Sequence, residues 1–158
     1  MTQAKTVFEK VWSGDLPSWP IFRSDRHGVQ ILLDIYPAHP GHVLIIPEEP
    51  IDHVFELPMQ RHLQLFALAK IMAEHMQAIL GSQRVKYVVS GYDIAHVHIH
   101  VLPSFTRGDV EEAFEARTKV PASKAALMAM QQRLMFPPEV IALAEAELAR
   151  IAQIDGIR

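Results

Sequence analysis

Residues 94–102 read Ile-Ala-His-Val-His-Ile-His-Val-Leu, and within them a histidine alternates with an aliphatic residue at every step from His96 to Val101. Successive side chains of a β-strand point to opposite faces, so this pattern predicts a strand with three histidines on one face. The aliphatic residues form the other face, which we expect to be buried against a core. An ordinary exposed strand face would carry Thr, Lys or Glu, so we interpret the histidine face as chemically active.

Three interpretations of the histidine face are open. The first is structural, with histidines that are exposed or merely hydrogen-bonded. The second is a metal site. Neighbours on one face lie about 6.5 to 7 Å apart, so three histidines cannot share one ion, but two could bind it with His42 or Asp93 and leave an open position for catalysis. The third is nucleophilic catalysis, in which His98 attacks phosphorus while His96 and His100 fix its tautomer and bind the phosphate oxygens.

The segments around this strand predict the rest of an α+β domain. Residues 85–90 form a second β-type run, and the turn residues Gly91, Tyr92 and Asp93 between the two runs predict a hairpin. The other expected elements are a short helix at 6–12, two or three strands between 20 and 47, a long amphipathic helix at 58–80, and helices at 120–136 and 138–154. Their order predicts a mainly antiparallel sheet of about five strands.

The composition of the chain restricts the class of protein. Its 158 residues, 49% of them hydrophobic, are enough for one domain with its own core. The absence of cysteine excludes cysteine nucleophiles and thiolate zinc sites. A net charge of -3 argues against a duplex nucleic acid or a membrane surface as partner. Residues 1–12 lack the apolar core of a signal peptide, which predicts a cytoplasmic protein, and no glycine-rich phosphate loop occurs in the chain.

The sequence resembles the histidine triad family, whose signature is His-φ-His-φ-His-φ-φ with φ an apolar residue. Residues 96–102 match that signature fully, and residues 34–47, DIYPAHPGHVLIIP, are similar to a second block of the family. The opening residues 6–18 are similar to the family's N-terminal helix and the turn after it. The resemblance implies a catalytic domain over 1–110, followed by a C-terminal helical extension over 111–158 that packs on the same domain.

The resemblance also implies a nucleotide hydrolase or transferase that forms a covalent nucleotidyl-histidine on the middle histidine, His98. His42 and His100 would contact the α-phosphate, the backbone carbonyl of His96 would orient the nucleophile, and Asp34 would hold the ribose hydroxyls. The substrate would be a purine nucleotide, and the chain a homodimer paired through the long helix and a sheet edge. No cofactor is implied, beyond a divalent metal that accompanies a polyphosphate substrate. The residues implied to line the nucleotide pocket are Phe8, Val11, Leu16, Leu32, Ile35, Ser90 and Asp93.

The chain departs from the family pattern at several positions. Thr6 and Glu9 stand where some members carry a zinc-binding Cys-x-x-Cys, so no such zinc is expected. Tyr92 and Asp93 replace the residues that usually follow the glycine before the triad. A carboxylate beside a phosphate is unfavourable unless it binds a protonated leaving amine. We therefore predict cleavage of nucleoside phosphoramidates or related nucleoside monophosphate conjugates.

Two other functions follow from the same sequence. The first is hydrolysis of dinucleoside polyphosphates, in which Arg107 of the loop after the triad would contact the second nucleotide. The other is a nucleotide-binding regulator with little turnover, whose C-terminal helices present a surface to a partner.

Overall fold

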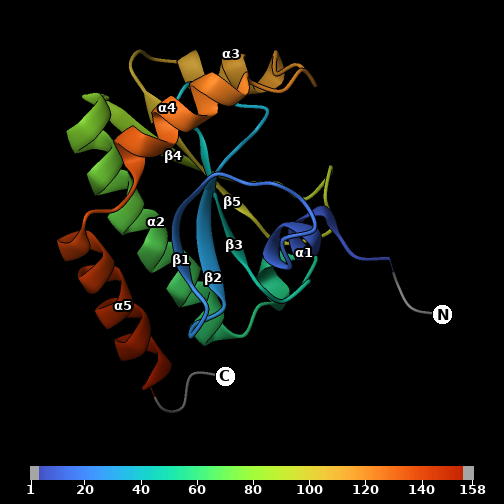
Figure 1. Cartoon of the computed structure of the whole chain (residues 1–158), viewed down its shortest axis with the longest axis vertical. Helices are drawn as coiled ribbons and strands as arrows, with labels where there is room; N and C mark the ends of the chain where they lie inside the picture. Colours follow the sequence, from blue (N-terminus) through green and yellow to red (C-terminus); the bar gives the residue numbers. More distant parts are fainter. Residues whose placement is uncertain (1–3, 155–158) are drawn as a thin grey trace.

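One antiparallel sheet organises the chain, whose computed structural model describes residues 4–154. Its strand order is β1-β2-β3-β5-β4, which leaves β1 and β4 at the edges. The strands are β1 (Pro20–Ser24), β2 (Val29–Leu33), β3 (Val43–Pro47), β4 (Arg84–Val89) and β5 (Ile99–Ser104). The α+β fold with five antiparallel strands is therefore confirmed. Figure 1 shows α2 and α5 on one side of this sheet and α1 on the other.

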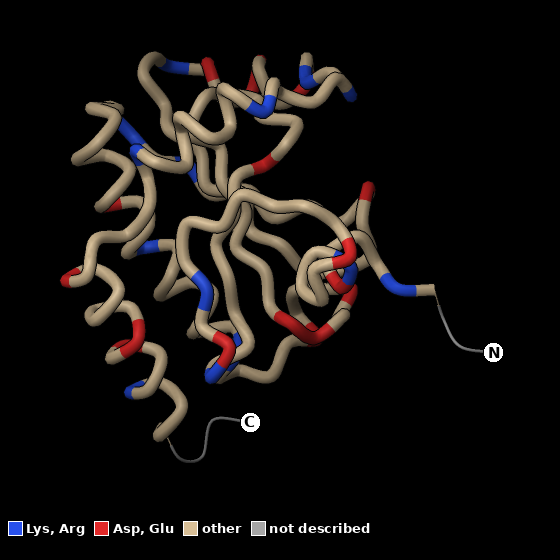
Figure 2. The backbone as a smooth tube through the Cα atoms, in the orientation of Figure 1, with Lys and Arg blue, Asp and Glu red and all other residues tan. Residues whose placement is uncertain are grey.

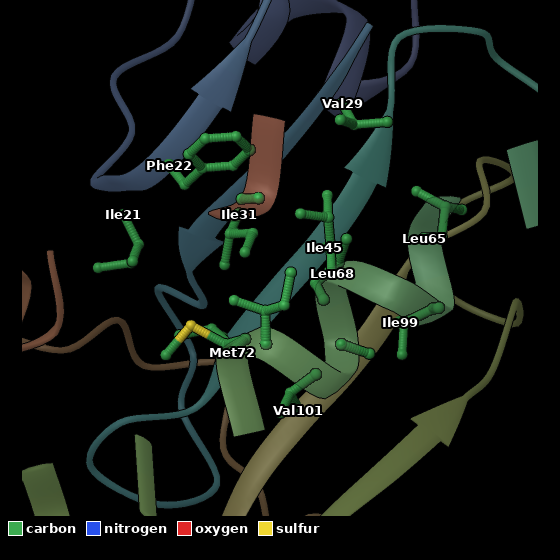
Figure 3. Close-up of a cluster of buried hydrophobic side chains, with 14 of the residues drawn as sticks. Ile21, Phe22, Val29, Ile31, Ile45, Leu65, Leu68, Met72, Ile99 and Val101 are labelled. Atoms are coloured by element: carbon green, nitrogen blue, oxygen red, sulfur yellow. The ribbon is translucent and has the colours of Figure 1, made fainter. Parts of the chain in front are cut away.

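Alternation along the strands divides the sheet into two faces. In β3, Val43 and Ile45 enter the main hydrophobic core, whereas Leu44 and Ile46 join a smaller cluster beneath α1 (Val7–Trp12). Figure 3 shows part of the main core, in which strand residues meet the buried side chains of α2. Strands β2, β3 and β5 contain no Lys, Arg, Asp or Glu, and Figure 2 shows the charged positions mainly on surrounding helices and loops.

The long helix α2 runs from Met59 to Leu80, as predicted. Pro58 stands at its N-cap and Gly81 at its C-cap, with a left-handed φ of 70° at the glycine. Proline has no backbone N–H to satisfy at a helix start, and glycine adopts the left-handed conformation without strain, so both ends follow from the sequence. Among the residues that the structure describes, no helix is long and apolar enough to cross a membrane.

Strand β5 is shorter than predicted, because it begins at Ile99 rather than Ile94. Its pairing with both neighbours ends at that residue, opposite Val89 of β4 and Ile45 of β3. The preceding segment turns toward the chain beyond β3, where the N–H of Val97 donates to the carbonyl of Ile51 at 2.7 Å. The predicted hairpin is therefore present with a longer connection, residues 90–98, and only one histidine of the triad lies within a strand.

Three helices follow the sheet instead of the two predicted. They are α3 (Asp109–Glu115), α4 (Lys124–Leu134) and α5 (Pro138–Ala152), and a single 3-10 turn, η1 (Val54–Glu56), precedes α2. Helix α4 begins later than the predicted residue 120 because the hydroxyl of Ser123 caps it, accepting from the N–H of Ala126 at 3.2 Å. Leucines of α4 and α5 lie in the main core. The expected domain division at residue 110 falls inside α3.

Candidate active site

Four histidines and one aspartate are brought together at one end of the sheet. His100 lies in β5 and His42 immediately precedes β3, while His96 and His98 lie in the connection before β5. Pairing of β3 with β5 sets Leu44 opposite His100, which brings the ring of His42 beside that of His100. All four rings and the Asp34 side chain are buried.

Gly41 allows the chain to deliver His42 at this position. Its φ is +93°, a conformation that side chains rarely adopt, and a Cβ built there would lie 2.6 Å from Cδ1 of Leu80 at the end of α2. The predicted turn before β3 therefore needs glycine for both conformation and space.

His98 has a fixed tautomer. Its Nδ1 lies 2.7 Å from the backbone carbonyl oxygen of His96, and a carbonyl only accepts, so Nδ1 carries the proton. The Nε2 atom then holds the lone pair. The ring packs between those of Phe8 and His100, with centroids 5.2 and 4.8 Å away, and it also lines a cavity of about 130 Å³. The His98 ring, whose Nε2 holds the lone pair, therefore borders a cavity.

His42 and His100 form a directional relay. The N–H of Ala38 donates to Nδ1 of His42 at 3.1 Å, so the proton of His42 is on Nε2. This Nε2–H donates in turn to Nδ1 of His100 at 2.9 Å, and the proton of His100 is therefore on its own Nε2. Next to the lone pair of His98, the site consequently presents an N–H donor from a neutral imidazole.

His96 has no nitrogen free for chemistry. Its Nε2 lies 2.9 Å from the carbonyl oxygen of Pro47, so it donates, and its Nδ1 accepts from the hydroxyl of Thr6 at 3.0 Å. Thr6 is also the N-cap of α1, where its side chain and that of Glu9 form a reciprocal capping box. The His96 side chain, which was expected to help bind the phosphate oxygens, has both ring nitrogens engaged instead, and the contact with Thr6 was not predicted.

Burial keeps these histidines neutral. It lowers the pKa of His42 to about 3 and that of His100 to about 2, and the positive charge of Arg117 contributes to both shifts. Burial also lowers the pKa values of His96 and His98. Neutral rings retain the lone pairs and the directional hydrogen bonds described above.

We expect the free energy of unfolding to fall as the pH drops from 6.5 to 5. Each buried histidine has a lower pKa folded than unfolded, so the unfolded chain binds more protons in this window. For His42 and His100, whose folded pKa values lie far below this window, the loss approaches about 1.4 kcal/mol per pH unit each as the unfolded imidazole becomes fully protonated. Urea unfolding at pH 7.5, 6.5 and 5.5 measures it, and a His42→Gln variant, with one fewer buried imidazole, would show a shallower dependence. A stability that stays constant across the window would contradict the buried neutral rings.

Asp34 faces the relay but is held by other partners. Its Oδ1 accepts from the N–H of Tyr36 at 2.8 Å, and its Oδ2 lies 3.2 Å from Nη1 of Arg117 and 3.6 Å from Nδ1 of His42. Burial raises the pKa of Asp34, against the effects of that backbone hydrogen bond and of Arg117. The ribose role implied by the resemblance would require these contacts to coexist with, or yield to, two hydroxyls.

Two residues near the site were not predicted. Phe114 of α3 stands edge-on to His100, with ring centroids 5.1 Å apart, and Arg117 lies just beyond the same helix. Val110, Phe114 and Arg117 are four and three residues apart, the spacing of one helix face, so the pattern was available in the sequence. Seven helical residues were too few for that periodicity to stand out.

The predicted nucleobase residues do not all meet. Phe8, Val11 and Leu32 pack with two residues of β3 in the cluster beneath α1. Ile35 packs against the main core instead, and Leu16 is exposed. Phe8, Val11 and Leu32 therefore form one apolar cluster. They are buried because α1 packs against the sheet.

The other two predicted pocket residues lie in the connection before β5. Ser90 lines the same cavity as His98. Asp93 is 72% exposed in its side chain, and its Oδ2 lies 3.6 Å from Nη2 of Arg117. The prediction of an amine leaving group was based on Asp93, and the structure places the guanidinium of Arg117 beside that carboxylate.

The donor atoms of Asp34, His42 and His100 lie within 4.8 Å of one another, which raises the metal interpretation again. The lone pair of each histidine on this side is already used, because His42 Nδ1 accepts from Ala38 and His100 Nδ1 accepts from His42. A cation here would have to break both hydrogen bonds. The arrangement therefore suits proton positioning better than metal binding.

Comparisons with known proteins agree on one family. The family model of the HIT domain matches residues 20–107. "Protein hit" of Bacillus subtilis (strain 168) is 30% identical over 108 residues, which cover 65% of this chain and 73% of that protein. Bis(5'-adenosyl)-triphosphatase of Dictyostelium discoideum is 25% identical over 77 residues, 46% of this chain and 52% of that protein.

Solved structures share the fold at lower sequence identity. A crystal structure of a HIT-like protein involved in cell-cycle regulation from Bartonella henselae superposes with a TM-score of 0.70 and 16% identity, covering 85% of this chain and 98% of that one. A hypothetical histidine triad nucleotide-binding protein from Sulfolobus tokodaii gives a TM-score of 0.69 at 17% identity, with coverages of 87% and 93%.

Proposed function

Because the chain belongs to the HIT domain family, we propose that it is a nucleotide hydrolase or transferase whose reaction proceeds through a nucleotidyl group on His98. The observation that carries the proposal is the set of fixed tautomers. They leave a lone pair on Nε2 of His98 and an N–H on Nε2 of His100, in two rings whose centroids are 4.8 Å apart. One group can attack phosphorus while the other binds a phosphate oxygen.

The reaction has two steps. In the first, Nε2 of His98 forms a bond to the α-phosphorus, the bond from phosphorus to the leaving group breaks, and the leaving group departs with the electron pair and takes up a proton. The imidazolium that results is stabilised by the His96 carbonyl, which accepts from Nδ1–H. In the second, water attacks phosphorus, the P–N bond breaks, and the water proton is released. The products are a nucleoside monophosphate and neutral His98.

We propose a purine nucleoside phosphoramidate as the preferred substrate, because the exposed Asp93 carboxylate, whose charge acts on His98, can bind a departing amine. The expected result is a kcat/KM for an adenosine phosphoramidate about tenfold or more above that for a diadenosine polyphosphate, a difference of about 1.4 kcal/mol. Asp93→Asn should remove most of this preference. Glu139→Gln, at an exposed position of α5, is the matched control.

Hydrolysis of dinucleoside polyphosphates is the second candidate. The similarity to the Dictyostelium triphosphatase and the cation at Arg117 both favour it. Such a substrate would bring its own divalent metal. Faster turnover of the dinucleoside polyphosphate would decide for this candidate. If intact mass finds no nucleotidyl adduct with either substrate, and neither is turned over, the chain is a nucleotide-binding regulator instead. The homodimer implied by the resemblance stays a prediction.

A further inference from the structure

Arg117 lies in the segment between α3 and α4, which returns across the site. Five residues after Arg117, the N–H of Ala122 donates to the carbonyl of Ile35 at 2.8 Å and ties this segment to the chain after β2. The guanidinium touches three groups: Asp34 at 3.2 Å, Asp93 at 3.6 Å, and the face of Phe114, whose ring centroid is 4.7 Å from Cζ. Only 20% of the Arg117 side chain is exposed. It is thus a largely buried cation with three contacts rather than an exposed surface side chain.

This cation reaches the triad by two routes. Through Asp34, it is one contact away from His42, and through Phe114 it is one contact away from His100. Its charge is also close enough to contribute to lowering the pKa values of His42, His98 and His100. Asp93 is the other charged residue that acts on His98. Arg117 is therefore a cation that contacts two neighbours of the triad and whose charge acts on His98.

A bound nucleotide needs such a cation. The histidines are neutral, and two carboxylates, Asp34 and Asp93, lie close to them, so a phosphate group would enter a site with negative charge already present. A guanidinium fork that binds carboxylates also matches the oxygens of a phosphate, with charge-assisted hydrogen bonds. Without Arg117 nothing among these groups would offset the charge of the phosphate.

We propose that Arg117 binds a phosphate oxygen of the nucleotide and that Asp34 and Asp93 hold its guanidinium ready when no nucleotide is present. The inference rests on the proposed function, since it assigns a further residue to that substrate site. The segment after α3 is then part of the phosphate-binding site.

The test compares AMP with adenosine, which differ by the phosphate alone. Isothermal titration of the full chain should show that Arg117→Met weakens AMP binding by about 10- to 100-fold while the affinity for adenosine changes less than twofold. Arg117→Lys keeps the charge but loses the planar guanidinium, so its affinity for AMP should lie between those of the wild type and of Arg117→Met. Arg150→Met, at an exposed site on α5, is the matched control and should leave both affinities unchanged.

The adenosine measurement separates phosphate binding from a structural effect. A loosened segment or a displaced Asp34 would weaken both ligands by the same factor, and that result would overturn the inference, as would unchanged AMP affinity. Far-UV circular dichroism and thermal unfolding establish that each variant is folded. If the wild-type chain binds AMP no more tightly than adenosine, the chain has no phosphate-binding site of the kind proposed. The proposed function then fails, and the role of Arg117 fails with it.

Discussion

The variant His98→Asn is expected to lose turnover while it still binds nucleotide. We expect kcat to fall by on the order of 10⁴-fold or more, because asparagine can donate to the His96 carbonyl but has no lone pair able to attack phosphorus. Steady-state kinetics on the preferred nucleotide measure the loss. Intact mass after rapid quenching in an alkaline denaturant, in which the acid-labile P–N bond survives, should show a nucleotidyl adduct on the wild-type chain and none on the variant.

The matched control is His62→Asn, at a position on α2 where the ring stacks on Phe66, 4.9 Å between centroids. That change should alter kcat less than twofold, and AMP affinity should stay within a few-fold of wild type in both variants. If His98→Asn retains kcat within tenfold of wild type, or if the adduct maps to His100, another ring is the nucleophile and the assignment of His98 is wrong.

His42→Phe should have the second-largest effect, although residue 42 does not offer a nitrogen to the nucleotide. The substitution removes the Nε2–H that donates to His100, so His100 is free to place its proton on Nδ1 and lose the donor that faces phosphate. We expect kcat to fall by about 10²- to 10³-fold, by the same reasoning that applies when a tautomer-fixing partner is lost. Adenosine affinity should not change.

Glutamine at position 42 distinguishes the relay from simple packing. Its amide nitrogen can occupy the place of Nε2 and donate to His100, so His42→Gln should recover at least tenfold of the activity lost in the phenylalanine variant. The nitrogen chemical shifts of His100 report its tautomer directly. Equal activity of the Phe and Gln variants would show that the ring volume, and not the donated proton, is what the site needs.

Local patterns in the sequence predicted the parts of the fold that depend on local rules. The ends of α2 followed from Pro58 and Gly81, and the two faces of β5 followed from alternation. Alternation also identified His98 and His100 correctly as neighbours, although β5 starts only at Ile99. The predicted strand was too long because periodicity cannot show where a partner strand ends.

The remaining contacts depend on residues that are distant in sequence. Thr6 meets His96 across 90 positions, and Arg117 meets Asp34 across 83. Thr6 belongs to a local capping box and Arg117 shares a helix-face spacing with Phe114, but neither pattern indicates which distant polar group will be buried beside it. Only the assembled sheet, with α1 on one side and the segment after α3 at its end, brings them together.

The contact between Thr6 and His96 bears on where this protein can be truncated. Sequence similarity marks residues 20–107, a stretch that includes all five strands but excludes Thr6 and Phe8 on one side and Phe114 and Arg117 on the other. A fragment cut at those limits would keep the three histidines of its signature and lose Thr6, Phe8 and Phe114, which contact His96, His98 and His100 respectively. The residues matched by the family model therefore do not include every residue that contacts the triad, and the histidine signature does not indicate which residues are left out.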